Sequence, residues 1–177
     1  MEIERLSFSE ETKSFLKATD LDWFRQQLID WADYNLRDFP WRRTTDPHAI
    51  FVAEFLLQKT DAAKIVPIYE TFQARHPTIE ALSLVSMTEV ADLLKPLEFH
   101  FRAERLCESV QKINAFYHCK IPDVEAQLLV LPGVGKYTAW SANIAEDSSA
   151  TAAISICTHA FGQQQPILNT NVARLVS

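Results

Sequence analysis

Hydrophobic residues along most of this chain recur every three or four positions, which is the spacing of one face of an α-helix. Two clear stripes are Leu21, Phe24, Leu28 and Trp31, and further along Ala103, Leu106, Val110, Ile113 and Tyr117. No segment alternates with the period of two that is typical of a strand. The pattern therefore predicts an all-α protein with about nine or ten helices.

Capping residues predict where several of these helices begin. Asp20 can cap the first stripe, and Asp46 followed by Pro47 has the sequence of an N-cap and a first helical residue. Thr60 is expected to cap the next helix, with a bend at Pro67.

Two later segments carry similar signals. Ser86, with Glu89 three residues later, has the pattern of a capping box. The polar residues 146–149 predict an interruption, after which an apolar helix is expected over residues 151–161.

The helix that follows Pro47 is apolar almost all round and is therefore expected to be buried, yet Glu54 lies in its middle. A carboxylate there is costly unless it is paired, and its pKa is expected to rise, as a general acid requires. A structural Glu paired with an arginine at the helix edge is the alternative. The residues alone leave both open.

A second candidate site is the segment 131–139, Leu-Pro-Gly-Val-Gly-Lys-Tyr-Thr-Ala, which holds two of the three glycines in the chain. A glycine-rich turn before a helix directs unpaired N–H groups outward, where they can bind a phosphate. A plain turn between two helices is the alternative.

Composition narrows the class of protein. A chain of 177 residues with 47% hydrophobic residues suits one domain or two small ones. No segment has the length of a membrane span and the first residues are not a signal peptide, so we expect a soluble protein of the cytoplasm or nucleoid. Three cysteines without Cys-x-x-Cys spacing argue against disulfides and a zinc site. The net charge of −6 argues against nucleic-acid binding, although basic residues gather near the motifs below.

Four segments share their order with one family: Phe-Pro-Trp-Arg at 39–42, Glu-Phe-Leu-Leu-Gln-Lys-Thr at 54–60, the glycine-rich 131–139, and Ile-Leu-Asn-Thr-Asn-Val-Ala-Arg at 167–174. From about Asp22 onward the chain resembles the helix-hairpin-helix (HhH-GPD) DNA glycosylases. That superfamily includes endonuclease III, the adenine glycosylase MutY and the archaeal T/G-mismatch thymine glycosylases. The resemblance implies an all-α, endonuclease III-like fold. It implies an N-terminal arm 1–19 and a glycosylase domain 20–177, with a six-helix subdomain over about 45–145, its hairpin at 128–139, and a second subdomain from 20–44 and 146–177.

The resemblance also implies a reaction, base-excision repair in which a mispaired base is turned out of the duplex and its N-glycosidic bond is hydrolysed. The base would be adenine opposite 8-oxoguanine or guanine, or thymine opposite guanine. Glu54 would be the acid, Gln58 and Lys59 would enter the base stack, and Trp41 and His100 would line the base pocket. The DNA-binding set would be completed by Gly133, Gly135, Lys136, Tyr137 and Thr138. Tyr137 replaces the lysine that would cut the strand, which implies a monofunctional enzyme.

Three departures from the family pattern bear on activity. Asn169 stands at the position of the catalytic aspartate, and Glu98 stands at the position of a loop glycine. The chain ends at Ser177 without the four cysteines of an iron–sulfur cluster, so we expect no cofactor, no metal and a C-terminally incomplete second subdomain. The stretch 146–150 also lengthens the path to Asn169. The expected partner is duplex DNA bound by a monomer, with no membrane partner. An inactive module that binds mismatched or bent DNA, or a truncated remnant, remains the alternative.

Overall fold

The computed structural model of the protein describes residues 18–97, 101–134 and 148–164. These ranges contain helices and turns and no strand, so the predicted all-α class is confirmed. The α-helices are α2 (Ala18–Asn35), α3 (Pro47–Leu57), α4 (Ala62–Arg75), α5 (Ile79–Ser83), α6 (Met87–Leu94), α7 (Phe101–Tyr117), α8 (Glu125–Leu128) and α9 (Ser148–Phe161), with 3-10 turns η1 (Pro40–Arg42) and η2 (Lys95–Leu97).

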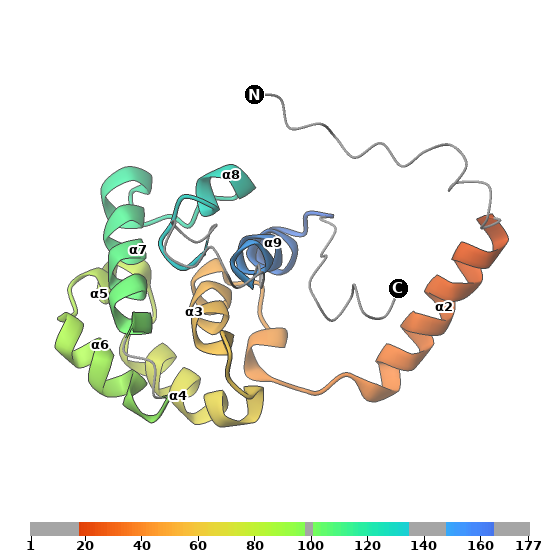
Figure 1. The fold of residues 1–177 in the computed structure, drawn as a ribbon, viewed down its shortest axis with the longest axis horizontal. Helices are drawn as coiled ribbons and strands as arrows, with labels where there is room; N and C mark the ends of the chain where they lie inside the picture. Colours follow the sequence, from red (N-terminus) through yellow and green to blue (C-terminus); the bar gives the residue numbers. More distant parts are fainter. Residues whose placement is uncertain (1–17, 98–100, 135–147, 165–177) are drawn as a thin grey trace, which may run out of the picture. The chain divides into compact units, whose positions relative to one another are not determined.

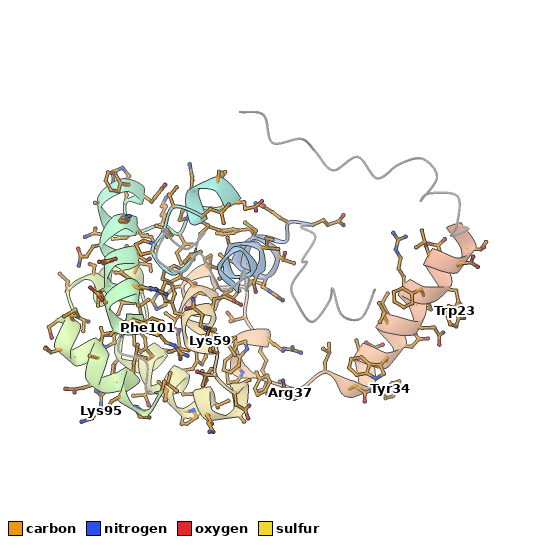
Figure 2. All side chains as sticks on the ribbon, viewed as in Figure 1. Trp23, Tyr34, Arg37, Lys59, Lys95 and Phe101 are labelled. Atoms are coloured by element: carbon orange, nitrogen blue, oxygen red, sulfur yellow. The ribbon has the colours of Figure 1, made fainter. Side chains whose placement is uncertain are left out.

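The chain divides into two compact units, Met1–Asp38 and Phe39–Ser177. Helix α2 belongs to the first unit, and the whole stripe that predicted it, from Leu21 to Trp31, is exposed. Trp23 and Tyr34 also stand out from α2 with exposed side chains (Figure 2). The buried core lies in the second unit. The predicted arm and subdomain limits stay predictions.

Helix α3 is the central element of the second unit, with α4, α7 and α9 packed against it (Figure 1). Its start follows the prediction: Pro47 is the first helical residue, and the Asp46 side chain accepts hydrogen bonds from the backbone N–H groups of His48 and Ala49, at 3.2 and 3.3 Å. The buried residues of α3 are His48, Ala49, Ile50, Phe51, Val52, Ala53, Phe55 and Leu56. A helix covered on so many sides holds its remaining polar residue in an apolar setting.

Three of the other predicted helix starts differ from the structure. Helix α2 begins at Ala18 and Asp20 lies inside its first turn, so the assignment of Asp20 as N-cap was wrong. Helix α4 is capped by Asp61, whose side chain accepts from the N–H of Ala63, so the assignment of Thr60 as N-cap was wrong. The Thr60 hydroxyl instead bonds to the Gln58 carbonyl and accepts from Arg102. Helix α9 begins at Ser148, inside the expected interruption, because serine is tolerated in the first turn of a helix.

The remaining core follows the predicted patterns. Ser86 caps α6 by accepting from the N–H of Glu89 at 3.2 Å. The stripe on α7 is buried at Ala103, Leu106, Val110 and Ile113, and Tyr117 packs half-buried at its end. Helices α5 and α6 cover α7 (Figure 1). Across the part of the chain that the structure describes, no helix is long and apolar enough to cross a bilayer.

Candidate active site

The Glu54 carboxylate lies where α9 packs against α3. Its Oε1 atom accepts a hydrogen bond of 2.6 Å from the Ser155 hydroxyl, which α9 supplies from 101 residues further along the chain. Burial disfavours the charged carboxylate and raises the pKa of Glu54 to about 7, while the hydrogen bond from Ser155 acts in the opposite direction. The expected rise in pKa is therefore confirmed. The partner found is a serine hydroxyl, in place of the arginine of the structural alternative.

A carboxyl group with a pKa of about 7 is populated in both protonation states near neutral pH. That is the range in which a general acid combines a transferable proton with sufficient acidity. Elevated pKa values of this origin, burial at a defined position between two helices, are typical of catalytic acids. Glu54 therefore has the properties of a proton donor.

Ser155 and His159 were not among the predicted site residues. The Ser155 hydroxyl lies 3.1 Å from Nδ1 of His159, and the same nitrogen lies 2.9 Å from the Ser155 carbonyl oxygen. Ser155 is buried and His159 is exposed. The available signal was their i, i+4 spacing on a helix whose neighbouring positions Ala152, Ala153, Ile156 and Cys157 are apolar and buried.

A tightly held turn follows the end of α3. Lys59 has a φ of +53°, a left-handed conformation that is uncommon for a lysine, and its side chain is exposed (Figure 2). The buried guanidinium of Arg102, from α7, donates to the carbonyl of Leu56 at 3.2 Å, to the carbonyl of Gln58 and to the Thr60 hydroxyl at 2.7 Å. Arg102 thus satisfies carbonyl groups that the end of α3 leaves without helical partners.

The same turn is joined to the glycine-rich segment. The Gln58 side-chain amide donates a hydrogen bond of 2.7 Å to the carbonyl of Gly133. Gly133 has a φ of +79°, and a Cβ atom added there would lie 2.8 Å from Cε1 of Phe55. The Ser109 hydroxyl binds the neighbouring carbonyl of Pro132 at 2.5 Å. The predicted requirement for a glycine at a tight turn is confirmed at Gly133.

Trp41 lies in an aromatic cluster at the entrance to α3. Its ring stacks on Phe39, with centroids 4.9 Å apart, and meets the edge of Tyr69 at 5.3 Å. A place for Trp41 in a base pocket stays a prediction. The other predicted site residues lie outside the described residues: His100, Gly135, Lys136, Tyr137, Thr138 and Asn169.

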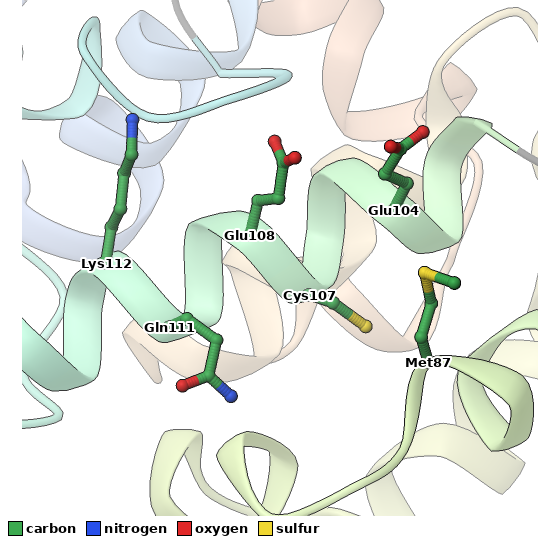
Figure 3. Close-up of a pocket in the computed structure, with 6 residues that line it drawn as sticks. All are labelled: Met87, Glu104, Cys107, Glu108, Gln111 and Lys112. Atoms are coloured by element: carbon green, nitrogen blue, oxygen red, sulfur yellow. The ribbon is translucent and has the colours of Figure 1, made fainter.

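A separate open hollow of about 630 Å³ lies between α6 and α7 (Figure 3). Its lining residues are Met87, Glu104, Cys107, Glu108, Gln111 and Lys112. Cys107 and Met87 face each other across it. This hollow shares no residue with the Glu54 site. Within the three described ranges, no group of three histidine, cysteine or acidic side chains is arranged to hold a metal ion.

Comparison with known proteins gives consistent matches. The family model described as HhH-GPD superfamily base excision DNA repair protein matches residues 52–177. The chain is 38% identical to the thymine-DNA glycosylase of Aeropyrum pernix over 92% of this chain and 67% of that protein. It is 32% identical to the adenine DNA glycosylase of Homo sapiens over 92% of this chain, although it spans only 29% of that longer protein.

Solved structures agree with this relationship. A thermostable thymine-DNA glycosylase matches with a TM-score of 0.76 and 28% identity, covering 90% of this chain and 69% of that one. A non-covalent endonuclease III–DNA complex matches with a TM-score of 0.68, covering 88% and 67%, and its 16% identity makes this a likeness of fold alone. The predicted endonuclease III-like architecture is confirmed.

Proposed function

The chain belongs to the HhH-GPD superfamily of base excision DNA repair proteins, and from this premise we propose that it is a mismatch-type DNA N-glycosylase. The proposed reaction is hydrolysis of the bond between a mispaired base and its deoxyribose in duplex DNA. It uses water as the second reactant and calls on no cofactor.

The observation that carries this proposal is the Glu54 carboxyl group, which Ser155 holds at 2.6 Å where α9 packs on α3 and whose pKa burial raises to about 7. Breaking an N-glycosidic bond leaves positive charge on the sugar and negative charge on the departing base. A protonated Glu54 neutralises the charge on the base as the bond breaks. Because Ser155 holds one carboxyl oxygen at 2.6 Å, the acid is fixed in position before substrate arrives.

The relatives support two substrates, and we rank the two by how closely and over how much of its length each relative matches the chain. The chain matches the Aeropyrum thymine-DNA glycosylase at higher identity, and over a larger share of the relative, than it matches the human adenine DNA glycosylase. We therefore place thymine opposite guanine first and adenine opposite 8-oxoguanine second. An acid at position 54 suits adenine as well, because a purine offers a ring nitrogen for the proton.

The proposed DNA contacts centre on the turn after α3. Lys59 is exposed beside Gln58, and both are proposed to enter the gap left by the extruded base. The turn at Gly133 is proposed to place backbone N–H groups against a phosphate, a contact that positions DNA without reading its sequence. Lys59 on the first turn and Arg105 beside Gly133 are proposed to supply positive charge at these contacts, although the whole chain has a net charge of −6.

Asn169 and Tyr137 limit the proposed activity. An asparagine cannot supply the negative charge that stabilises the sugar cation, a loss of about 3–4 kcal/mol or on the order of a thousandfold in rate. Tyr137 cannot form an imine with the sugar, so the proposed enzyme leaves the strand intact. We propose a slow monofunctional glycosylase, which acts on DNA as a monomer.

A single-turnover assay tests the proposal. Duplexes with thymine opposite guanine, or adenine opposite 8-oxoguanine, are incubated with the wild type, Asn169→Asp, Glu54→Gln and the double variant, and alkali then reveals abasic sites. We expect release by Asn169→Asp, roughly a thousandfold slower release by the wild type, and none when Glu54 is replaced. Tight duplex binding without release by any folded variant would instead establish a binding module.

A further inference from the structure

We propose that Ser155 and His159 are positioning residues that assign the acid proton of Glu54 to its Oε2 atom. They do so by making Oε1 a fixed hydrogen-bond acceptor. The inference rests on the proposed function, because it specifies how the same carboxyl group presents its proton to a leaving base.

The contacts of His159 define its tautomer. Its Nδ1 atom lies 2.9 Å from the backbone carbonyl oxygen of Ser155, and a carbonyl oxygen can only accept. Nδ1 must therefore carry a hydrogen. The same N–H lies 3.1 Å from the Ser155 hydroxyl oxygen, so it donates toward both oxygens of Ser155.

The contacts of Ser155 define the direction in which its hydroxyl group donates. A serine has one hydroxyl hydrogen and accepts through its lone pairs. Because the His159 side of Oγ faces a donor, the hydroxyl hydrogen is left for Glu54, whose Oε1 lies 2.6 Å away. Ser155 is thus a dedicated donor to one carboxyl oxygen.

The hydroxyl donor of Ser155 determines which carboxyl oxygen of Glu54 carries the proton. When Glu54 is protonated, its hydrogen resides on one of two oxygens. A hydrogen on Oε1 would point toward the hydroxyl hydrogen of Ser155, so the proton is held on Oε2. The donated bond also stabilises the carboxylate, which opposes the effect of burial on the Glu54 pKa.

The other charged side chains on the packed elements are engaged elsewhere or exposed. Of the thiols, the half-buried Cys107 lines the hollow between α6 and α7, and the buried Cys157 lies against the Asp123 carbonyl. On α7, Arg102 binds carbonyl groups at the end of α3, and Arg105 packs by Phe101 and Gly133. On α4, Tyr69 lies against Trp41, and Asp61 caps its own helix. Among the described residues, the hydrogen bond to the Glu54 carboxyl group comes from Ser155.

The test follows the Glu54 carboxyl directly by carbon-13 NMR of protein labelled at the glutamate carboxyl carbon, with Glu54→Gln assigning the signal. The full chain is titrated as wild type, Ser155→Ala, Ser155→Thr and His159→Leu. The matched control is Thr158→Ala, which removes a hydroxyl from the same helix that bonds to the Ile154 carbonyl at 2.8 Å.

We expect Ser155→Ala to raise the Glu54 midpoint by about one pH unit, because a hydrogen bond to the charged form is lost. Ser155→Thr should restore the wild-type midpoint. His159→Leu should raise it by less, since the hydroxyl remains but is less strongly polarised. Thr158→Ala should leave it unchanged. An unmoved midpoint in folded Ser155→Ala overturns the proposal, and an unmoved midpoint in folded His159→Leu overturns the role of His159.

The NMR readout separates this inference from the proposed glycosylase activity. If no duplex loses a base to Asn169→Asp while the midpoints move as described, the proposed function fails and the hydrogen-bonded arrangement stands. If base release occurs, its decline at high pH should move with the NMR midpoint in each variant. If base release declines at the same pH with and without the Ser155→Ala substitution, the positioning role is overturned.

Discussion

The side-chain amide of Gln58 donates a hydrogen bond of 2.7 Å to the carbonyl oxygen of Gly133, 75 residues further along the chain. This contact joins the turn after α3 to the glycine-rich turn after α8. Both turns are proposed to contact DNA, one through the base stack and the other through a phosphate. The hydrogen bond therefore holds the two turns at a fixed spacing before DNA binds, which lowers the entropic cost of binding.

Replacing Gln58 with alanine should weaken duplex binding. We expect a loss of about 1 kcal/mol in unfolding free energy from the missing hydrogen bond. We also expect a Kd about tenfold higher, equivalent to about 1.4 kcal/mol. The control is Gln111→Ala, because Gln111 makes the same kind of bond, 2.8 Å to the Ser83 carbonyl, away from this site. A similar rise in Kd for both variants would contradict the role of Gln58.

Gly133→Ala should be strongly destabilising. The new methyl group meets Phe55 at 2.8 Å in a backbone with φ of +79°. We expect a loss of about 2–5 kcal/mol from left-handed strain and overpacking together. Gly162→Ala separates the two causes, because Gly162 has φ of +64° and, among the described residues, no atom that a Cβ there would meet within 4 Å. That control should lose about 1–2 kcal/mol from strain alone in urea denaturation, and an equal loss in both variants would count against the close contact.

Arg102→Met should destabilise the end of α3. The substitution removes the donors to the carbonyl groups of Leu56 and Gln58 while keeping a long apolar side chain. We expect a loss of about 2–4 kcal/mol, because buried carbonyl groups are left unsatisfied. Arg75→Met, at an exposed position of α4, should change stability by about 0.5 kcal/mol or less. Urea denaturation of the two variants decides the question, and indistinguishable midpoints would refute it.

Glu54 should make the protein less stable as the pH rises. Its pKa is 4.5 in the unfolded reference and about 7 in the folded protein, so the folded state binds more protons between these values. The free energy of unfolding carries its full contribution from Glu54 below about pH 4.5. It falls by about 3 kcal/mol as the pH rises through about 7. Glu54→Gln should lack this loss.

The measurement is the difference in unfolding free energy between Glu54→Gln and the wild type from pH 4 to pH 8. The difference is required because burial lowers the pKa of His48, which reduces stability as the pH falls below 6.5. His48 is present in both proteins, so its contribution cancels. A difference that stays constant with pH would show that the Glu54 pKa is not raised.

Local signals in the sequence predicted much of the fold. Asp46 and Ser86 cap their helices as expected, because a cap depends on residues within three positions of itself. Glu54 was expected in a buried helix with a raised pKa because α3 is apolar almost all round, and both expectations are confirmed. Gly133 adopts the positive φ for which a glycine is suited.

Tertiary contacts account for what sequence reasoning missed. Thr60 and Asp61 are both good N-caps. Asp61 caps α4, while the Thr60 hydroxyl accepts a hydrogen bond from Arg102. Ser155 approaches Glu54 only because α9 packs on α3, and nothing near position 54 in the sequence indicates a partner 101 residues away. The prediction for Asn169 is addressed by the single-turnover assay, and those for Trp41, His100 and Tyr137 stay predictions.

The distance along the chain between Glu54 and Ser155 has a consequence for biosynthesis. A nascent chain that has completed α3 through α7 still lacks the hydroxyl that holds the carboxyl group, because α9 is made last of the described helices. A contact of such high sequence separation forms late, since its loop must close first. Partly synthesised or partly folded chains therefore present an unoriented acid, and the proposed excision activity should arise only when folding of the second unit is complete.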